Sequence, residues 1–147
     1  MHHFHFGIRE GIVVPSNSLV EICFHGIGGQ GAVTAANLLV ETALKDGNKA
    51  VQAFPFFGSE RRGAPVRAFA RISEDEIHLR SEIYSPDIII VLDESILGLV
   101  DILKGLKNGG KILINTTKKP NDFNFSKKFH VATNPTSSIF FSFSLYL

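Results

Sequence analysis

The stretch "LVEICFHGIGGQGAVTAANLL", residues 19–39, decides the fold of this chain. An apolar run rich in strand-forming residues, 19–25, leads into a loop dense in glycine. Residues 32–45 then carry apolar side chains at helical spacing, and Gly47 ends that pattern. The order strand, tight loop, helix predicts the first half of a βα unit.

The glycine loop points to an anion. A helix that follows a strand in this way directs its first N–H groups and the positive end of its dipole into the hollow of the loop, which favours phosphate. Gly28, Gly29 and Gly31 permit close backbone approach and positive φ, and Gln30 supplies the turn's hydrogen-bonding side chain. The alternative is a tight turn that binds nothing, and the residues alone leave both interpretations open.

Two well-known phosphate motifs fit this loop poorly. Gly26, Gly28 and Gly31 satisfy the Gly-x-Gly-x-x-Gly pattern of dinucleotide-binding folds, but that site also needs an acidic residue after the second strand to hold the ribose. The corresponding stretch here, "KAVQAF" at 49–54, contains no acid. A Walker loop is excluded because no Gly-Lys-Ser/Thr follows the glycines. A nicotinamide-dependent dehydrogenase is therefore the weaker hypothesis.

A second cationic loop is expected at the same edge of the sheet. In "GSERRGAP", residues 58–65, Arg61 and Arg62 can present guanidinium groups to a phosphate or to carboxylates of a partner. A surface ion pair with Glu60 is the structural alternative. After a βα crossover this loop emerges beside the glycine loop, at the edge where α/β folds collect their ligands.

Strand and helix signals alternate along the rest of the chain. Strand patterns occur at residues 49–54, 66–72, 77–80, 87–95, 111–115 and 129–133, and a helix pattern occurs at 96–106. The turn "SEDE" between 66–72 and 77–80 predicts an antiparallel hairpin. Residues 19–133 are thus expected to form a three-layer α/β/α domain, a Rossmann-like variant with a mixed sheet.

One face of that hairpin is predicted to be cationic. Arg67, Arg71, His78 and Arg80 would share it, either as solvated surface or as a contact for an acidic partner.

Composition narrows the class of protein. The 147 residues, 44% of them hydrophobic, suffice for one domain core, and a net charge of +1 indicates neither a nucleic-acid partner nor a membrane surface. No apolar run approaches the ~20 residues of a membrane span. A single cysteine gives no disulfide framework and cannot alone hold an iron–sulfur cluster, so we expect a cytoplasmic protein.

The sequence offers no evident catalytic nucleophile. Cys23 lies within an apolar strand and is interpreted as a buried hydrophobe, and His25 has no clear partner. Asp93 and Glu94 end a strand at the ligand edge, but helix capping explains them as well. These residues favour a binding unit over a complete active site.

The two ends of the chain differ from its middle. Residues 1–18 are expected to be a poorly ordered tail or translated leader, whose three histidines are more typical of solvated side chains than of metal ligands. Residues 134–147 are rich in Phe and Ser, and the hypothesis for them is a truncated or frame-shifted end.

Three stretches together resemble a known family. "GIGGQGAVTAANLL", "QAFPFFGSERRGAPVRAFARI" and "IHLRSEIYSPDIIIVLDESIL" are similar, in order and spacing, to gamma subunits of 2-oxoacid:ferredoxin oxidoreductases, with pyruvate:ferredoxin oxidoreductase (pyruvate synthase) favoured over the 2-ketoisovalerate enzymes. The resemblance covers residues 20 to about 133.

The resemblance implies a chemistry shared between subunits. It implies oxidative decarboxylation of pyruvate to acetyl-coenzyme A, or the reverse, with thiamine diphosphate and [4Fe–4S] clusters on alpha, beta and delta partners and ferredoxin as electron acceptor. It also implies coenzyme A binding by Gly28, Gly29, Gln30, Gly31 and Ala32, together with Arg61 and Arg62. A stand-alone nucleotide- or coenzyme A-binding module remains the alternative from another class.

Overall fold

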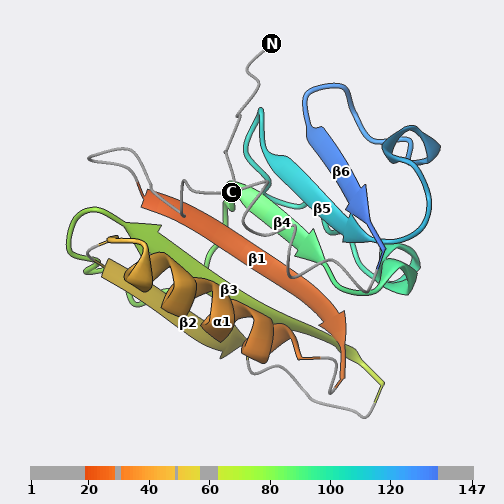
Figure 1. Cartoon of the computed structure of the whole chain (residues 1–147). Helices are drawn as coiled ribbons and strands as arrows, with labels where there is room; N and C mark the ends of the chain where they lie inside the picture. The colour runs from red at the N-terminus through yellow and green to blue at the C-terminus, as the bar shows by residue number, and fades with distance from the viewer. Residues whose placement is uncertain (1–18, 29–30, 49, 57–62, 136–147) are drawn as a thin grey trace.

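A six-stranded mixed sheet forms the centre of the molecule. In this computed structural model the described residues are 19–28, 31–48, 50–56 and 63–135. The strands are β1 (Leu19–Ile27), β2 (Ala50–Phe56), β3 (Pro65–Ser73), β4 (Ile88–Val91), β5 (Lys111–Asn115) and β6 (His130–Asn134). Their order across the sheet is β2-β3-β1-β4-β5-β6 (Figure 1). The predicted tail at 1–18 and all but the first two residues of the predicted divergent end lie outside the described residues.

The central strands run in parallel, and one strand opposes them. β1 pairs in parallel with β4, as do β4 with β5 and β5 with β6. β3 is antiparallel to both β1 and β2, so β2 runs in the same direction as β1 and the β1–α1–β2 crossover encloses β3. The predicted α/β fold with a mixed sheet is confirmed.

The expected hairpin partner of β3 was wrong. Residues 77–80 form no strand; β3 makes its antiparallel ladders with β2 and β1 instead. The alternation along β3 was read correctly, because Ala68, Ala70 and Ile72 lie in the core beneath α1 while Phe69 packs on the opposite face.

Helix α1 (Ala32–Lys45) has the predicted bounds and covers β1, β2 and β3 on one face of the sheet (Figure 1). Its buried side is narrow and mostly alanine, which lets the helix lie close to the strands. The buried residues are Ala32, Ala35, Ala36, Leu39, Val40 and Ala43. Leu38, placed on the apolar stripe by its spacing, is instead 45% exposed. Gly47, at φ 101°, ends the helix in a conformation that glycine adopts freely.

Two separate clusters cover the opposite face. Over β4 and β5, Ile96, Ile102 and Leu106 pack on the strands, whereas over β1 and β3 the cover is Ile83, which contacts Cys23 and Phe69. The helix expected at 96–106 was wrong: only the 3-10 turn η1 (Glu94–Gly98) forms, followed by further turns.

Local side-chain bonding accounts for that short helix. Gly98 lowers helix propensity, and the Asp101 carboxylate accepts a hydrogen bond from the Leu103 N–H at 3.1 Å, a local bond that competes with helical pairing. Gly105, at φ 83°, then turns the chain under Tyr84, whose carbonyl leaves no room for a Cβ.

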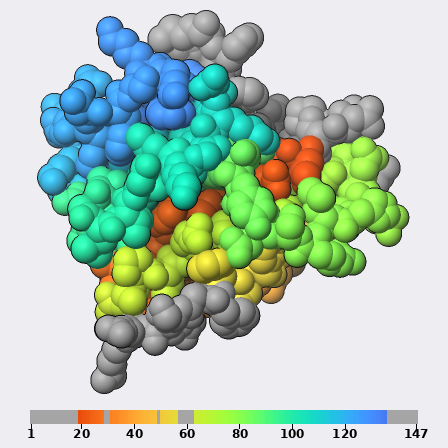
Figure 2. Space-filling view, turned by 180° about the vertical axis from the view of Figure 1, so that it is seen from behind, coloured from red at the N-terminus to blue at the C-terminus, as the bar shows by residue number. Residues whose placement is uncertain are grey.

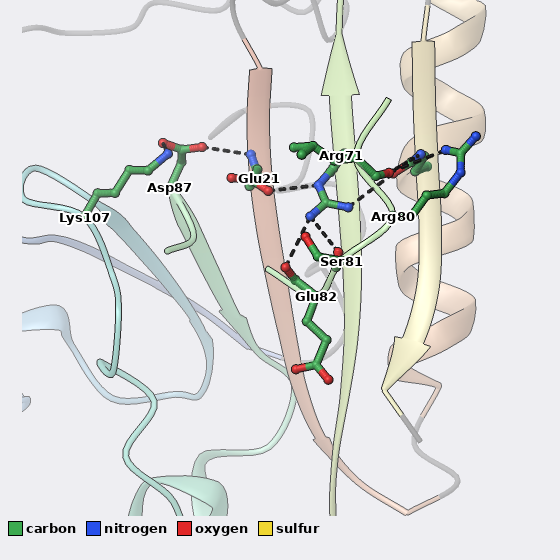
Figure 3. A network of polar contacts seen from close by, with 9 residues as sticks. Glu21, Arg71, Arg80, Ser81, Glu82, Asp87 and Lys107 are labelled. Atoms are coloured by element: carbon green, nitrogen blue, oxygen red, sulfur yellow. Dashed lines mark hydrogen bonds and ion pairs between the residues drawn. The ribbon is translucent and has the colours of Figure 1, made fainter. Parts of the chain in front are cut away.

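A buried arginine fixes residues 77–83 against the sheet. Arg71 is 1% exposed, and its Nε pairs with Glu21 at 2.9 Å while its Nη2 donates to the carbonyl oxygens of Ser81 and Glu82 at 2.8 and 3.3 Å (Figure 3). The predicted cationic hairpin face is therefore wrong for Arg71, which is buried, and for His78 and Arg80, which are exposed outside any strand.

A second ion pair ties this network to the next strand. Asp87, just before β4, accepts from the Glu21 N–H at 2.8 Å and from Lys107 Nζ at 2.9 Å (Figure 3).

Candidate anion-binding site

The candidate site begins where β1 ends and α1 starts. Gly31 caps the helix in the left-handed region, at φ 81° and ψ 24°, and no side chain accepts a hydrogen bond at this N-cap. No acidic residue occupies the first turn of α1. The first N–H groups of the helix are therefore not neutralised by a capping side chain or a local carboxylate, which is the electrostatic condition for an anion to bind there.

The second predicted loop returns to the same place. The Gly28 N–H donates to the Ala64 carbonyl oxygen at 3.0 Å, and a Cβ built on Gly28 would lie 3.1 Å from the Gly63 nitrogen. Ile27 and Pro65 are paired where β1 ends and β3 begins. The expected proximity is confirmed for the residues that flank the two loops.

The structure describes only part of the predicted site. Gly28, Gly31 and Ala32 lie at this edge, with Ala32 buried in the core at 2% exposure. The predicted site residues Gly29, Gln30, Arg61 and Arg62 lie outside the described residues, and their roles remain predictions.

The strand that a dinucleotide site would use carries no acid. β2 runs parallel to β1 and ends at Phe56 at the glycine-loop edge, and its residues 50–56 include no Asp or Glu. β2 therefore supplies no carboxylate that could hold the ribose of a dinucleotide at this edge.

The two acids after β4 have structural roles. Asp93 Oδ1 accepts from the backbone N–H and the hydroxyl of Ser95, at 2.9 and 2.6 Å, and so caps η1 as predicted. Glu94 accepts a hydrogen bond from Thr116, which lowers the pKa of the Glu94 carboxyl, and it pairs with Lys118 at 3.1 Å. Both carboxylates are thus engaged by neighbouring residues.

Cys23 and His25 form a neutral pair beside the site. Their Sγ and Nε2 atoms are 3.4 Å apart, and both side chains are buried. Burial raises the pKa of the Cys23 thiol to about 12 and lowers the pKa of the His25 imidazole to about 4; the charge of Arg67 opposes the first shift and adds to the second. Both shifts favour the neutral thiol and the neutral imidazole near pH 7, and the burial of the free Cys23 side chain confirms the prediction of a buried hydrophobe.

Next to this pair lies Arg67, which was predicted to lie on a cationic face as solvated surface or as a contact for an acidic partner; its aromatic stacking was not predicted. The Arg67 guanidinium lies 4.2 Å from the centroid of the Phe56 ring and 5.7 Å from that of Phe69. Alternation along 66–72 placed Arg67 on the correct face of its strand. Its contact with Phe56 depends on the β2–β3 register, which no local pattern encodes.

Three further features of the described ranges concern metal binding, membrane spanning and a surface hollow. Among these residues there is no group of three or more His, Cys, Asp or Glu side chains that could hold a metal ion. None of the helices in them is long and apolar enough to cross a bilayer. A hollow of about 300 Å³ between Leu19, Ser73 and residues 75–79 lies at the opposite end of β1 and includes no predicted site residue.

Comparison with known proteins defines the class. Residues 21–143 match the family model described as pyruvate ferredoxin/flavodoxin oxidoreductase. The pyruvate/ketoisovalerate oxidoreductases common subunit gamma of Thermococcus kodakarensis is 59% identical over 100 residues, which cover 68% of this chain and 54% of that relative. The chain therefore belongs to the pyruvate ferredoxin/flavodoxin oxidoreductase family, and it spans about half the length of the curated relatives it matches.

Solved structures agree with this assignment. The crystal structure of pyruvate oxidoreductase subunit PORC from Thermotoga maritima matches with a TM-score of 0.63 and 37% identity, covering 79% of this chain and 61% of that one. A 2-oxoglutarate:ferredoxin oxidoreductase from Magnetococcus marinus, solved with 2-oxoglutarate, coenzyme A and succinyl-CoA bound, matches with a TM-score of 0.53 over 82% of this chain and 20% of that chain. At 17% identity this second likeness is one of fold alone.

Proposed function

We propose that this chain is the gamma-subunit part of a 2-oxoacid:ferredoxin oxidoreductase and that its glycine loop helps to bind coenzyme A. The observation that carries the proposal is the hydrogen bond between Gly28 and Ala64, because it brings the flanks of the glycine loop and of the Arg61–Arg62 loop together at the N-terminus of α1. Phosphate suits both a helix N-terminus and forked guanidinium donors.

Within the site, each predicted residue has a chemical role. Gly28, Gly29 and Gly31 offer backbone N–H groups, Gln30 an amide, and Ala32 the first turn of α1, while Arg61 and Arg62 offset the charge of the phosphates or contact a neighbouring subunit. The uncapped start of α1 and the absence of an acid in its first turn support this arrangement.

The reaction itself belongs to an assembly. We propose oxidative decarboxylation of pyruvate to acetyl-coenzyme A, or the reverse carboxylation, with 2-ketoisovalerate as the second substrate because the name of the Thermococcus relative covers both. Alpha, beta and delta subunits would hold thiamine diphosphate and the [4Fe–4S] clusters, and ferredoxin would accept the electrons. The single cysteine of this chain supports placing the clusters elsewhere. We also propose that this assembly is located in the cytoplasm.

Affinity purification of the full chain from its native cells, under exclusion of air, tests this function. The expected result is co-purification of subunits that contain iron and thiamine diphosphate, and pyruvate-dependent reduction of ferredoxin that requires coenzyme A. A chain that purifies alone and binds NADH would contradict the proposal and favour the dehydrogenase. A lone chain that binds coenzyme A would favour the stand-alone module.

A further inference from the structure

Arg67 and Arg71 lie on the same face of β3 but differ in their partners. Arg71 uses its Nε and both terminal nitrogens for hydrogen bonds, including the ion pair with Glu21. Arg67, four residues closer to the glycine loop, forms no hydrogen bond or ion pair with any residue in the described ranges. The sheet therefore carries one neutralised arginine and one that keeps its full donor capacity.

The position of Arg67 is fixed by aromatic rings. It lies in a cross-strand row with His25 on β1 and Phe56 on β2, and its guanidinium stacks 4.2 Å from the Phe56 centroid. Contact with a ring face orients a guanidinium while leaving its N–H groups free at the edge of the plane. Arg67 is half-buried, so those donors are held in place at the surface of the sheet.

Nothing beside Arg67 in the described ranges balances its charge. The nearest titratable groups are Cys23 and His25, which burial keeps neutral near pH 7. The half-buried acid on this face, Glu21, is engaged by Arg71. Among the described residues, therefore, no carboxylate pairs with the Arg67 guanidinium.

Arg67 lies on β3 between the pairing of Ile27 with Pro65 at the glycine-loop edge and the part of this face that residues 77–83 cover. Residues 77–83 cover the far half of this face, where Arg71 lies, and Ile83 packs in one cluster with Cys23 and Phe69. Figure 2 shows β1, in red, visible between the teal residues that follow β4 and the yellow-green residues of β3. Arg67 lies two residues along β3 from Pro65, which pairs at this edge, and two residues of strand span about 7 Å.

We propose that Arg67 binds a phosphate group of the coenzyme A molecule whose other phosphates the glycine loop receives. This inference rests on the proposed function and adds a specific residue on the face of the sheet opposite α1. Phe56 and Phe69 position the guanidinium, and the phosphate supplies the charge that this face lacks.

The test is a calorimetric titration of the full chain, together with any subunits that co-purify, with coenzyme A and with pantetheine, which has no phosphate. Arg67→Gln is expected to weaken coenzyme A binding about tenfold or more, the effect of losing a hydrogen bond to a charged group, and to leave pantetheine binding unchanged. Arg67→Lys, which keeps the charge, should lose less. Arg80→Gln, an exposed arginine outside any strand, is the matched control and should bind as the parent does.

Several outcomes overturn the inference, and they separate it from the proposed function. Equal coenzyme A affinity in the parent and Arg67→Gln removes Arg67 from the site while leaving the glycine loop in it. Equal weakening for coenzyme A and pantetheine indicates lost packing rather than a lost phosphate contact. Loss of co-purifying subunits with unchanged coenzyme A affinity shows that Arg67 pairs with a carboxylate of a partner. A parent protein that binds no coenzyme A overturns both proposals.

Discussion

The Gly28 N–H donates to the Ala64 carbonyl oxygen at 3.0 Å, and this bond joins the end of β1 to the approach to β3. Gly28 has φ 21°, and a Cβ there would meet the Gly63 nitrogen at 3.1 Å. The bond therefore depends on glycine at this position, for reasons of both conformation and space.

Gly28→Ala should destabilise the chain by about 1–2 kcal/mol, because the added methyl forces the two loops apart and strains the backbone. Gly98→Ala is the matched control: a Cβ there meets nothing within 4 Å, and no loss is expected. Urea unfolding followed by circular dichroism measures both. Equal midpoints for the two variants would show that the loops tolerate a side chain at Gly28.

The Arg71 network predicts a large stability effect from a buried charge. Arg71→Met should cost about 3–5 kcal/mol, because it leaves Glu21 and two carbonyl groups without their donor. Arg80→Met, at an exposed arginine, should stay within about 0.5 kcal/mol of the parent.

Hydrogen exchange distinguishes this mechanism from general unfolding. At temperatures where Arg71→Met remains folded, the amides of residues 77–83 should exchange faster, because that segment loses its hydrogen bonds from Arg71. The amides of α1 should keep their protection, because Arg71 does not contact the helix. Uniform loss of protection across the chain would contradict the assigned role.

The buried His25 side chain is expected to lower the free energy of unfolding at acidic pH. Burial lowers its pKa from 6.5 to about 4, so the unfolded chain binds more protons than the folded one between those values. Stability contributed by neutral His25 is therefore complete above about pH 6.5 and falls as the pH drops toward 4, by about 3 kcal/mol in all.

His25→Gln removes the titrating group and is the control for this effect. Unfolding free energies measured from pH 4 to 7 should fall less steeply in His25→Gln than in the parent. If both proteins lose the same stability over this range, His25 is not the group responsible.

Elements with a strong local pattern were predictable from the sequence. Helix α1 follows from its spacing of apolar residues and from Gly47, and β5 from a short apolar run after "NGG". The irregular path of residues 77–80 was not predictable, because that segment is held by the side chain of Arg71 and by Gln52, which donates to the Leu79 carbonyl at 3.1 Å. Such contacts join residues that are distant in sequence and produce no periodic pattern of apolar residues.

Only part of the candidate site could be predicted from the sequence, for the same reason. The glycine loop can be recognised from its residue types, and the β1–α1–β2 crossover predicts the edge of the sheet that it shares with the second loop. The stacking of Arg67 on Phe56 arises from the β2–β3 register, which no local sequence pattern encodes.

The central claim is that the two loops together bind coenzyme A. The most direct measurement is the coenzyme A affinity of the assembled complex carrying Arg61→Ala with Arg62→Ala, compared with Lys104→Ala and Lys127→Ala, which removes the same charge from exposed positions elsewhere. The account predicts that the arginine variant binds coenzyme A about tenfold or more weakly while the lysine variant binds as the parent does. Equal affinity in all three complexes would contradict it.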